Sequence, residues 1–332
     1  MGSSVGPFPP GLRRFPTGSG PGRHGAHPSE PPHGCACICW WTVPTPSPAP
    51  LHAVGTVPTV PHGLRPRLIA TDLDGTLLRD DKTVSPRTVA ALAAAEAAGI
   101  HVLFVTGRPA RWMGPVSDHV HGHGLAICGN GAAVVDLRRG GELVAARPLS
   151  ARDGLAIVRA LRAAAPGVSF AVERSGGFHH EPGYGPSLPG SSARVAPAET
   201  LLADDPTFAG QPVLKLLALH DHLDPDAFLA LGKAVAGAHG EFTRSNPNAL
   251  LEISAPGVSK ASTLAGRCRE LGVGPDEVVA FGDMPNDLAM LSWAGTAYAM
   301  ANAHPAVLAA TPHHTLSNDE DGVARVIEQF LP

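Results

Sequence analysis

Two short apolar runs on either side of a helix-like segment limit the fold more than any other feature of the sequence. Residues 67–74 (R-L-I-A-T-D-L-D) begin as an apolar run and end in acids, and residues 101–105 (H-V-L-F-V) form a second run. Between them, Ser85 followed by proline is typical of a helix start, and Gly99 is typical of a helix end. Strand, helix and strand in this order predict a β-α-β unit and hence a parallel sheet.

The later pattern predicts an insertion into this α/β alternation. The expected helices are 151–164, 224–240, 260–271, 286–293 and 321–331, and the expected strands are 170–173, 213–219, 249–254, 277–281 and 296–300. Asn130 and Gly131 between two apolar runs predict a hairpin. We therefore expect a parallel-sheet, Rossmann-like α/β core in 67–147 and 249–332, with an inserted α+β cap domain in 148–248.

The first 66 residues differ in composition from the rest. They hold 15 of the 34 prolines and show no helical or strand period, so we expect a disordered Pro/Gly-rich tail. Arg13 and Arg14 could begin a twin-arginine signal, but no apolar stretch follows them. Three cysteines at alternate positions could bind a soft metal, although standard zinc sites use another spacing. These are Cys35, Cys37 and Cys39. Whether this segment is translated stays open.

Charge and hydropathy argue against two classes of partner. Residues 67–332 hold 21 basic and 28 acidic residues, which gives no electrostatic reason to expect nucleic acid. No run of about 18 apolar residues occurs, so we expect no membrane span. The sequence therefore predicts a cytoplasmic protein that binds neither nucleic acid nor membrane, and it leaves the oligomeric state open.

Polar residues follow four of the predicted core elements, at the edge where open α/β sheets carry their active sites. These residues are Asp72, Asp74, Thr106, Lys260, Asp283 and Asp287. One of the first two carboxylates can attack phosphorus while the other handles the proton of the leaving group. A hydroxyl and an ammonium can hold the transferring oxygens, and further carboxylates are ligands suited to Mg²⁺. The set predicts phosphoryl-transfer chemistry.

The same residues stand in four motifs that resemble those of the haloacid dehalogenase superfamily of phosphatases. The motifs are D-L-D-G-T-L-L at 72–78, V-T-G-R at 105–108, G-V-S-K at 257–260 and G-D-M-P-N-D at 282–287. Their order and spacing resemble the Cof-type subgroup, which carries a type IIB cap between the second and third motifs. Each motif alone has an ordinary explanation as a turn or helix start, but four in order do not. The resemblance covers 67–332.

The resemblance implies a role for each motif residue. Asp72 would be the nucleophile and a magnesium ligand, and Asp74 would be the general acid and base with its backbone carbonyl on the metal. Thr106 and Lys260 would bind the phosphoryl group. The remaining implied roles are magnesium binding by Asp283, metal support or orientation of the lysine by Asp287, and phosphate or ligand contact by Asn286. Mg²⁺ is the implied cofactor.

The residues that set substrate specificity are less well defined. Lys215 is a lone charge in an apolar strand run, so it either faces the cleft or extends to solvent. The segment 174–184, which contains His180, is either a substrate-facing loop or a surface hairpin. Arg108 could neutralise an anionic substrate or cap a helix. We take Arg108, Lys215 and His180 as candidate substrate residues.

Three functions fit these residues to different degrees. The first is Mg²⁺-dependent hydrolysis of a small-molecule phosphate monoester such as a sugar phosphate, nucleotide or flavin precursor, since a large cap favours small substrates. The second is a phosphomutase or a sugar-specific phosphatase of the same superfamily. The third is a non-enzymatic phospho-acceptor of the response-regulator type, which would lack both the D-x-D-G-T motif and the cap. The sequence does not identify the substrate.

Overall fold

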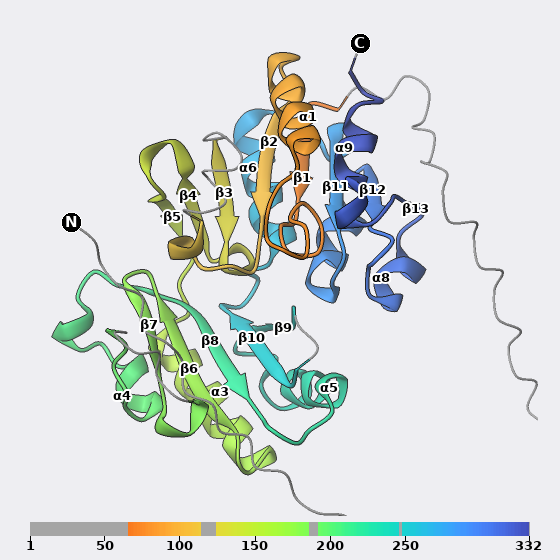
Figure 1. The fold of residues 1–332 in the computed structure, drawn as a ribbon. Helices are drawn as coiled ribbons and strands as arrows, with labels where there is room; N and C mark the ends of the chain where they lie inside the picture. The colour runs from red at the N-terminus through yellow and green to blue at the C-terminus, as the bar shows by residue number, and fades with distance from the viewer. Residues whose placement is uncertain (1–65, 114–123, 186–191, 246–247, 332) are drawn as a thin grey trace, which may run out of the picture. The chain divides into compact units, whose positions relative to one another are not determined.

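The computed structural model describes residues 66–113, 124–185, 192–245 and 248–331 (Figure 1). The predicted N-terminal tail, apart from its last residue, lies outside the described residues, and so do Cys35, Cys37 and Cys39. Within the described parts of the chain, no helix is long and apolar enough to cross a membrane.

The larger of two sheets has eight strands in the order β13-β12-β11-β1-β2-β3-β4-β5. Its strands are β1 (Leu68–Thr71), β2 (His101–Val105), β3 (Leu125–Cys128), β4 (Ala133–Asp136), β5 (Glu142–Ala146), β11 (Val278–Gly282), β12 (Thr296–Ala299) and β13 (His313–His314). The strands from β13 to β3 are parallel, and β4 and β5 extend the sheet in antiparallel fashion. This confirms the predicted parallel α/β core.

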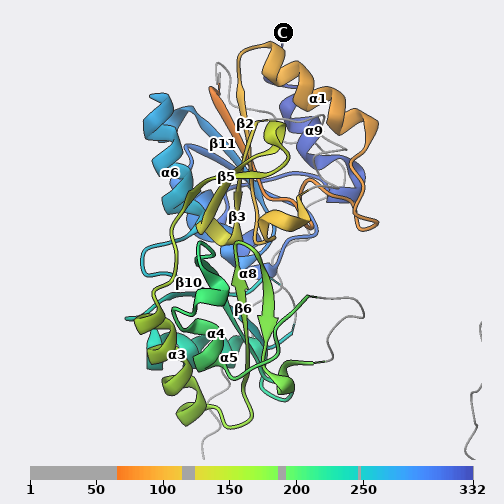
Figure 2. The same ribbon diagram turned by 90° about the vertical axis from the view of Figure 1, so that its left-hand side faces the viewer.

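Helices cover both faces of this sheet. They are α1 (Pro86–Ala97), α6 (Lys260–Leu271), α7 (Leu288–Trp293), α8 (Pro305–Ala310) and α9 (Gly322–Ile327). Helices α1 and α9 lie together on one face and α6 lies on the other (Figure 2). As predicted, Ser85 caps α1 by accepting the backbone N–H of Thr88 at 3.0 Å, and Gly99 follows the helix at φ +83°. The central strand β1 is fully buried and contributes apolar residues such as Leu68 and Ile69 to the core.

The second sheet has five antiparallel strands in the order β7-β6-β8-β10-β9. They are β6 (Ser169–Arg174), β7 (Gly177–His180), β8 (Val213–Leu219), β9 (Glu241–Thr243) and β10 (Leu250–Ser254), and the accompanying helices are α3 (Ala151–Ala164), α4 (Ala198–Leu202) and α5 (Pro225–Ala236). Helix α3 packs beside both α4 and α5 (Figure 1). The predicted α+β pattern of the middle segment is therefore found.

One strand belongs to a different sheet from the one predicted. The sequence assigned 249–254 to the parallel core, but β10 pairs antiparallel with β8 and β9 in the second sheet. A short apolar run carries no information about its pairing partner, which explains the error. The limits of the core and cap domains otherwise remain predictions. The hairpin predicted at Asn130 and Gly131 joins antiparallel β3 and β4, and Asn130 has the positive φ of 56° that such a turn favours.

Candidate active site

Three strand ends and one helix start bring the predicted site residues to one edge of the larger sheet. Asp72 follows β1, Thr106 follows β2, and Asp283 follows β11. Because β2, β1 and β11 are parallel neighbours, these residues meet at the same edge. Lys260 is the first residue of α6, whose N-cap Ser259 accepts the backbone N–H of Ser262 in a capping box.

Lys260 bridges two carboxylates from different motifs. Its Nζ donates to Oδ1 of Asp72 at 2.6 Å and to Oδ1 of Asp287 at 2.7 Å, and its side chain is only 1% exposed. Burial opposes the charge of Lys260, but the two carboxylates outweigh it and raise its pKa. Burial also raises the pKa of Asp72 well above its usual value, with Lys260 opposing and the neighbouring carboxylates adding to that rise.

Three buried carboxylates crowd together at this point. Asp72, Asp283 and Asp287 have oxygen atoms that all lie within 4.8 Å of one another. Burial, followed by the charge of Asp287, raises the pKa of Asp283 to about 7. A divalent cation would relieve this repulsion, and a set of oxygen donors alone suits Mg²⁺. The residues therefore fit the metal that the sequence implied.

Asp287 is held by hydrogen bonds to both of its oxygens. Oδ1 accepts from Lys260, and Oδ2 accepts the backbone N–H groups of Asp283 at 3.1 Å and Met284 at 3.0 Å. The side chain is fully buried. Asp287 thus orients both the lysine and the turn that carries Asp283.

The carboxylate of Asp74 lies outside this cluster. It accepts two hydrogen bonds from Arg108, at 2.5 Å from Nε and 2.7 Å from the terminal nitrogen, and Lys82 lies 3.3 Å away. Burial raises the pKa of Asp74, but the hydrogen bonds and charge of Arg108 outweigh it, so that the pKa is lowered. In this arrangement Asp74 is ionised and held by Arg108.

Thr106 and Asn286 are the remaining predicted phosphate-binding residues. Thr106 Oγ1 accepts the backbone N–H of Arg108 at 3.0 Å, which leaves its own hydroxyl proton available to donate. Asn286 Nδ2 donates to Oδ1 of Asn130 at 3.1 Å. Both residues line the same cavity as Asp72 and Asp74.

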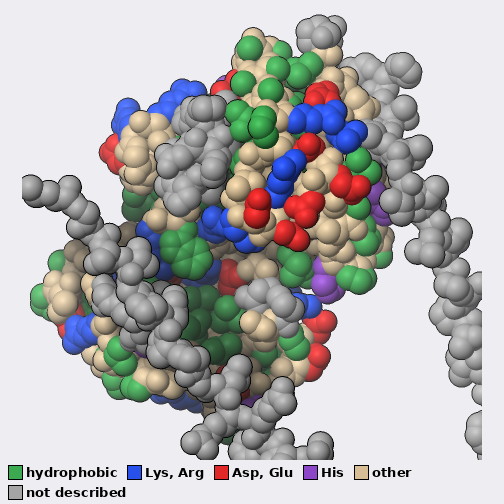
Figure 3. Space-filling model, viewed as in Figure 1, with side chains coloured by type: hydrophobic (Ala, Val, Ile, Leu, Met, Phe, Trp, Pro, Cys, Tyr) green, Lys and Arg blue, Asp and Glu red, His purple; other side chains and the backbone are tan. Residues whose placement is uncertain are grey.

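This cavity has a volume of about 850 Å³ and is lined by residues of both sheets and their connections. Figure 3 shows hydrophobic side chains within the hollow and Lys or Arg side chains at its edge. The large apolar lining residues are Trp112, Phe178, Tyr184, Leu217, Leu250 and Met284. The cavity size, its aromatic walls and its convergent polar and charged side chains are typical of small-molecule sites.

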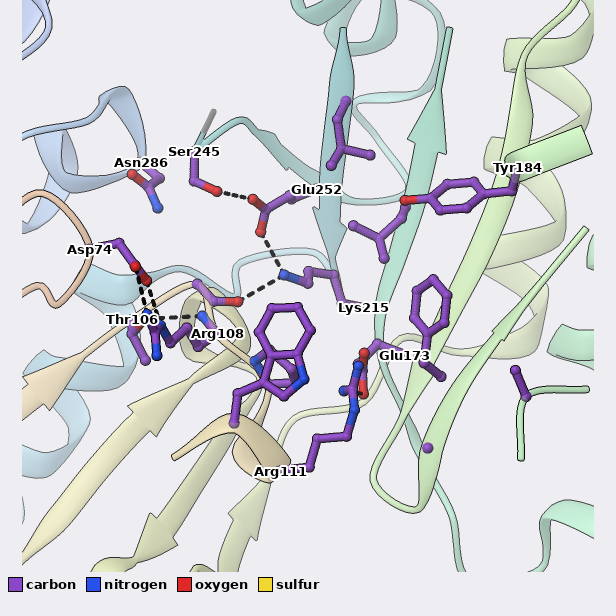
Figure 4. A pocket seen from close by; sticks show the side chains of 18 of the residues that line it. Asp74, Thr106, Arg108, Arg111, Glu173, Tyr184, Lys215, Ser245, Glu252 and Asn286 are labelled. Carbon is purple, nitrogen blue, oxygen red and sulfur yellow. Dashed lines mark hydrogen bonds and ion pairs between the residues drawn. The ribbon is translucent and has the colours of Figure 1, made fainter. Parts of the chain in front are cut away.

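Lys215 faces this cavity and does not extend to solvent. Its Nζ donates to Oε2 of Glu252 at 2.6 Å and to the carbonyl of Gly107 at 2.8 Å (Figure 4). A second pair lies nearby, where Arg111 donates to the carboxylate of Glu173. Arg108 lines the cavity too, but its guanidinium is engaged by Asp74.

The segment 174–184 is both part of a hairpin and a contributor to the cavity wall, the two alternatives that its sequence left open. Strands β6 and β7 form a hairpin, and Gly177, Phe178 and Tyr184 of this segment line the cavity. His180 is not among the residues found to line it. Its ring lies beside those of Phe178 and Tyr184, and its Nδ1 lies 2.8 Å from the carbonyl of Glu181.

Several residues in and beside the cavity were missed from the sequence, above all Glu252 and Glu173, which line it, and Asn130, which donates a hydrogen bond to Glu252. For Glu252, the sequence did contain a pattern that could have predicted its contact. Lys215 and Glu252 are single opposite charges within two apolar strand runs, and such lone charges pair when their strands are neighbours, as β8 and β10 are. For Asn130 and Glu173 no local pattern marks the contact.

The model of one protein family, haloacid dehalogenase-like hydrolase, matches residues 69–327. Among curated relatives, the pyridoxal phosphate phosphatase YbhA of Escherichia coli is 30% identical over 271 residues, which cover 80% of this chain and 98% of the relative. The 5-amino-6-(5-phospho-D-ribitylamino)uracil phosphatase YitU of Bacillus subtilis is 28% identical over 273 residues, with coverages of 80% and 98%.

Solved structures agree on the fold. A sugar phosphatase of haloacid dehalogenase subclass IIB superimposes with a TM-score of 0.65, covering 80% of this chain and 98% of its own. At 21% identity this likeness concerns the fold alone.

Proposed function

The chain belongs to the haloacid dehalogenase-like hydrolases and is a phosphatase of that family, and we propose that it hydrolyses a small-molecule phosphate monoester through a covalent aspartyl-phosphate on Asp72. The observation that carries the proposal is the position of Lys260, which bridges Asp72 and Asp287 beside Asp283 at a cavity of substrate size. A nucleophile, a cation for the phosphoryl oxygens and a metal-binding carboxylate thus converge on one point.

In the first step, a carboxylate oxygen of Asp72 attacks phosphorus. The bond between phosphorus and the ester oxygen breaks, and its electron pair goes to the leaving oxygen. Lys260 and the hydroxyl of Thr106 donate hydrogen bonds to the phosphoryl oxygens as their negative charge moves. In the second step, water attacks phosphorus, inorganic phosphate leaves, and Asp72 is regenerated.

Asp74 moves the protons in this scheme. It gives a proton to the leaving oxygen in the first step and takes one from the attacking water in the second. Since Arg108 stabilises the ionised form of Asp74, the acid role requires this ion pair to loosen. The dianionic phosphate of an entering substrate competes for the same guanidinium, which supports a role of Arg108 in binding substrate.

Mg²⁺ is the proposed cofactor. When bound, it would offset the charge of the phosphoryl oxygens and of the crowded carboxylates. The oxygens of Asp72 and Asp283 and the backbone carbonyl of Asp74 would hold it. Asp287 would support the site through its hydrogen bonds to Lys260 and to the backbone of Asp283. The buried carboxylate cluster supports this assignment.

The cavity favours a phosphorylated metabolite with a flat or apolar organic part and a few polar groups. Trp112, Phe178 and Tyr184 offer aromatic surfaces, and the ion pairs of Lys215 with Glu252 and of Arg111 with Glu173 offer polar groups beside them. The two named relatives act on pyridoxal phosphate and on a phosphoribitylaminouracil, both of which fit this description.

The test is release of inorganic phosphate from para-nitrophenyl phosphate by the purified full chain. We expect turnover that requires Mg²⁺, ceases in excess chelator and is inhibited by Ca²⁺, whose looser geometry would misplace Asp72. Asp72→Asn should abolish turnover while the protein stays folded. Turnover near the parent rate in that variant would overturn the proposal.

A further inference from the structure

Two short connections lead between the two sheets. Residues 147–150 lead from β5 to α3, and residues 255–259 lead from β10 back to α6 (Figure 2). The second connection ends at Lys260, the first residue of α6, so its path helps to decide where the ammonium of Lys260 lies. The side chain of Arg147 contacts both this connection and the start of α6, and the chemistry described above does not use it.

The guanidinium of Arg147 holds three acceptors at once. Its Nη2 donates to the carbonyl of Gly257 at 2.9 Å, and its Nη1 donates to the hydroxyls of Ser262 at 2.8 Å and Thr263 at 3.1 Å. Its backbone N–H donates to the carbonyl of Ala132 at 2.8 Å, which anchors Arg147 to the larger sheet. A planar fork of donors can join two segments in this way, whereas the single ammonium of a lysine cannot.

The two hydroxyls that accept from Arg147 belong to the hydrogen-bonded first turn of α6. Ser262 Oγ accepts the backbone N–H of Ser259 at 3.0 Å and donates to the carbonyl of Ser259 at 3.2 Å. Thr263 Oγ1 donates to the carbonyl of Gly131 at 2.8 Å. Because a hydroxyl has one proton and two acceptor sites, each of these groups keeps an acceptor site for Arg147. Arg147 therefore completes the hydrogen bonding of this turn.

The connection 255–259 is also held on its other side. The backbone N–H of Gly257 donates to Oε1 of Glu241 on β9 at 3.1 Å, while the carbonyl of Gly257 accepts from Arg147. Further along, a Cβ added to Gly131 would lie 2.3 Å from the carbonyl oxygen of Ser259, so the two backbones are packed tightly. The position of the turn is thus fixed by contacts with both sheets, and Arg147 supplies those from the β5 side.

Arg147 lines a second cavity, of about 430 Å³, which lies between α6 and strands β4 and β5. Arg269 in the last turn of α6 lines it too. None of the residues that line this cavity lines the substrate cavity. Since Arg147 is exposed, its guanidinium can be removed by substitution and replaced from solution at a place separate from the substrate.

We propose that Arg147 is a positioning residue for Lys260. By joining the connection 255–259 to the first turn of α6, it holds the lysine where its ammonium meets the phosphoryl oxygens. Arg147 itself does not touch the substrate. The inference rests on the proposed function and adds to it a residue outside the four motifs. Groups that stabilise a transferring phosphoryl group act only when they are held in place beforehand, so a small shift of Lys260 lowers the rate.

The first experiment compares two alanine substitutions in the full chain, with para-nitrophenyl phosphate and Mg²⁺. In Arg147→Ala we expect kcat to fall roughly tenfold, less than the roughly 100-fold cost of a 1 Å misplacement. KM should change little, because the lost interaction belongs to the transition state. Arg269→Ala removes the same charge from the same cavity at the far end of α6, so its kcat should equal that of the parent. Thermal unfolding verifies that both variants are folded.

The second experiment replaces the missing group. Guanidinium chloride, far below denaturing concentrations, should raise kcat of Arg147→Ala severalfold by filling the place of the side chain in the open cavity. Sodium chloride at the same ionic strength should not raise it, and guanidinium should not raise kcat of the parent or of Arg269→Ala. A residue that only stabilised the fold would not show this rescue, because guanidinium weakens the folded state.

Equal kcat values in Arg147→Ala and Arg269→Ala would overturn the inference, and so would a loss in Arg147→Ala that guanidinium does not reverse more than sodium chloride does. A failure of the proposed function looks different, since the parent itself would then release no phosphate, and both would be overturned. If the parent turns over with Mg²⁺ and Arg147→Ala keeps the parent kcat, the phosphatase assignment stands and only the role of Arg147 is wrong.

Discussion

The ammonium of Lys260 lies 2.6 Å from Oδ1 of Asp72, although 188 positions separate the two residues in the chain. The same nitrogen lies 2.7 Å from Oδ1 of Asp287, and all three side chains are buried. The contact joins the start of α6 to the end of β1. It also puts a positive charge beside the carboxylate that we propose as nucleophile.

Lys260→Met should strongly destabilise the metal-free protein. The substitution keeps the apolar stem but leaves Asp72 and Asp287 buried without their counter-charge, which costs about 3–5 kcal/mol in the free energy of unfolding. Urea denaturation in excess chelator measures this. Lys233→Met on α5 is the matched control, because Lys233 is exposed, and it should change stability by less than about 0.5 kcal/mol. Equal effects of the two substitutions would contradict the account.

Gly75→Ala should weaken Mg²⁺ binding. Gly75 has a φ of +77°, and an added Cβ would lie 2.3 Å from Oδ2 of Asp283, which must therefore move. Gly99→Ala carries similar backbone strain, with a φ of +83°, but meets nothing within 4 Å. Titration of phosphatase activity with Mg²⁺ should show an apparent affinity at least roughly tenfold lower for Gly75→Ala, since one ligand is displaced, and no such change for Gly99→Ala.

Asp74→Asn should affect substrates in proportion to how much their leaving groups need a proton. For alkyl phosphates we expect a loss in kcat of roughly 10²–10⁴, the usual share of general acid–base catalysis. For para-nitrophenyl phosphate, whose leaving group is stable as an anion, the loss should be much smaller. Steady-state rates on both substrates test this. A loss of the same size on both would remove Asp74 from the acid role.

Mg²⁺ should stabilise the fold through the carboxylate cluster. A ligand that binds only the folded state at 100 times its dissociation constant adds about 2.7 kcal/mol, so the midpoint of thermal unfolding should rise with Mg²⁺ concentration. Asp283→Asn should remove most of the rise. Asp276→Asn, at an exposed position before β11, should keep it. A rise that persists in Asp283→Asn would locate the ion elsewhere.

The parts of the fold that follow from local chemistry could be predicted from the sequence. The start of α1 at its Ser85 cap and the turn at Asn130 each depend on a few neighbouring residues, and the strand-helix-strand order predicts the parallel pairing of β1 with β2. The sheet to which β10 belongs depends on pairing with distant β8, so the sequence led to the wrong core assignment. Strand β5 (E-L-V-A-A) is exposed along its length and its apolar residues do not alternate with polar ones, so it was missed.

The candidate site likewise has one part that the sequence predicts and another part that it does not. Asp72, Thr106 and Asp283 each follow a strand of one parallel sheet, and Lys260 begins a helix that packs on this sheet. These motif residues therefore lie together, and that geometry is implied by the order of the motifs. The hydrogen bonds that connect Glu252 to Asn130 and Asn130 to Asn286 join three segments that are far apart in the chain. These contacts form only when both sheets are assembled, so no local sequence pattern predicts them.

The central claim is that phosphate passes through a covalent bond to Asp72, and chemical trapping tests it most directly. The full chain with Mg²⁺ and substrate is quenched during turnover and treated with borohydride, which reduces an acyl phosphate of aspartate to homoserine. Peptide mass spectrometry then identifies the modified residue. The account predicts homoserine at position 72, dependent on substrate and absent in Asp72→Asn. Turnover without modification at position 72, or homoserine at another aspartate, would contradict it.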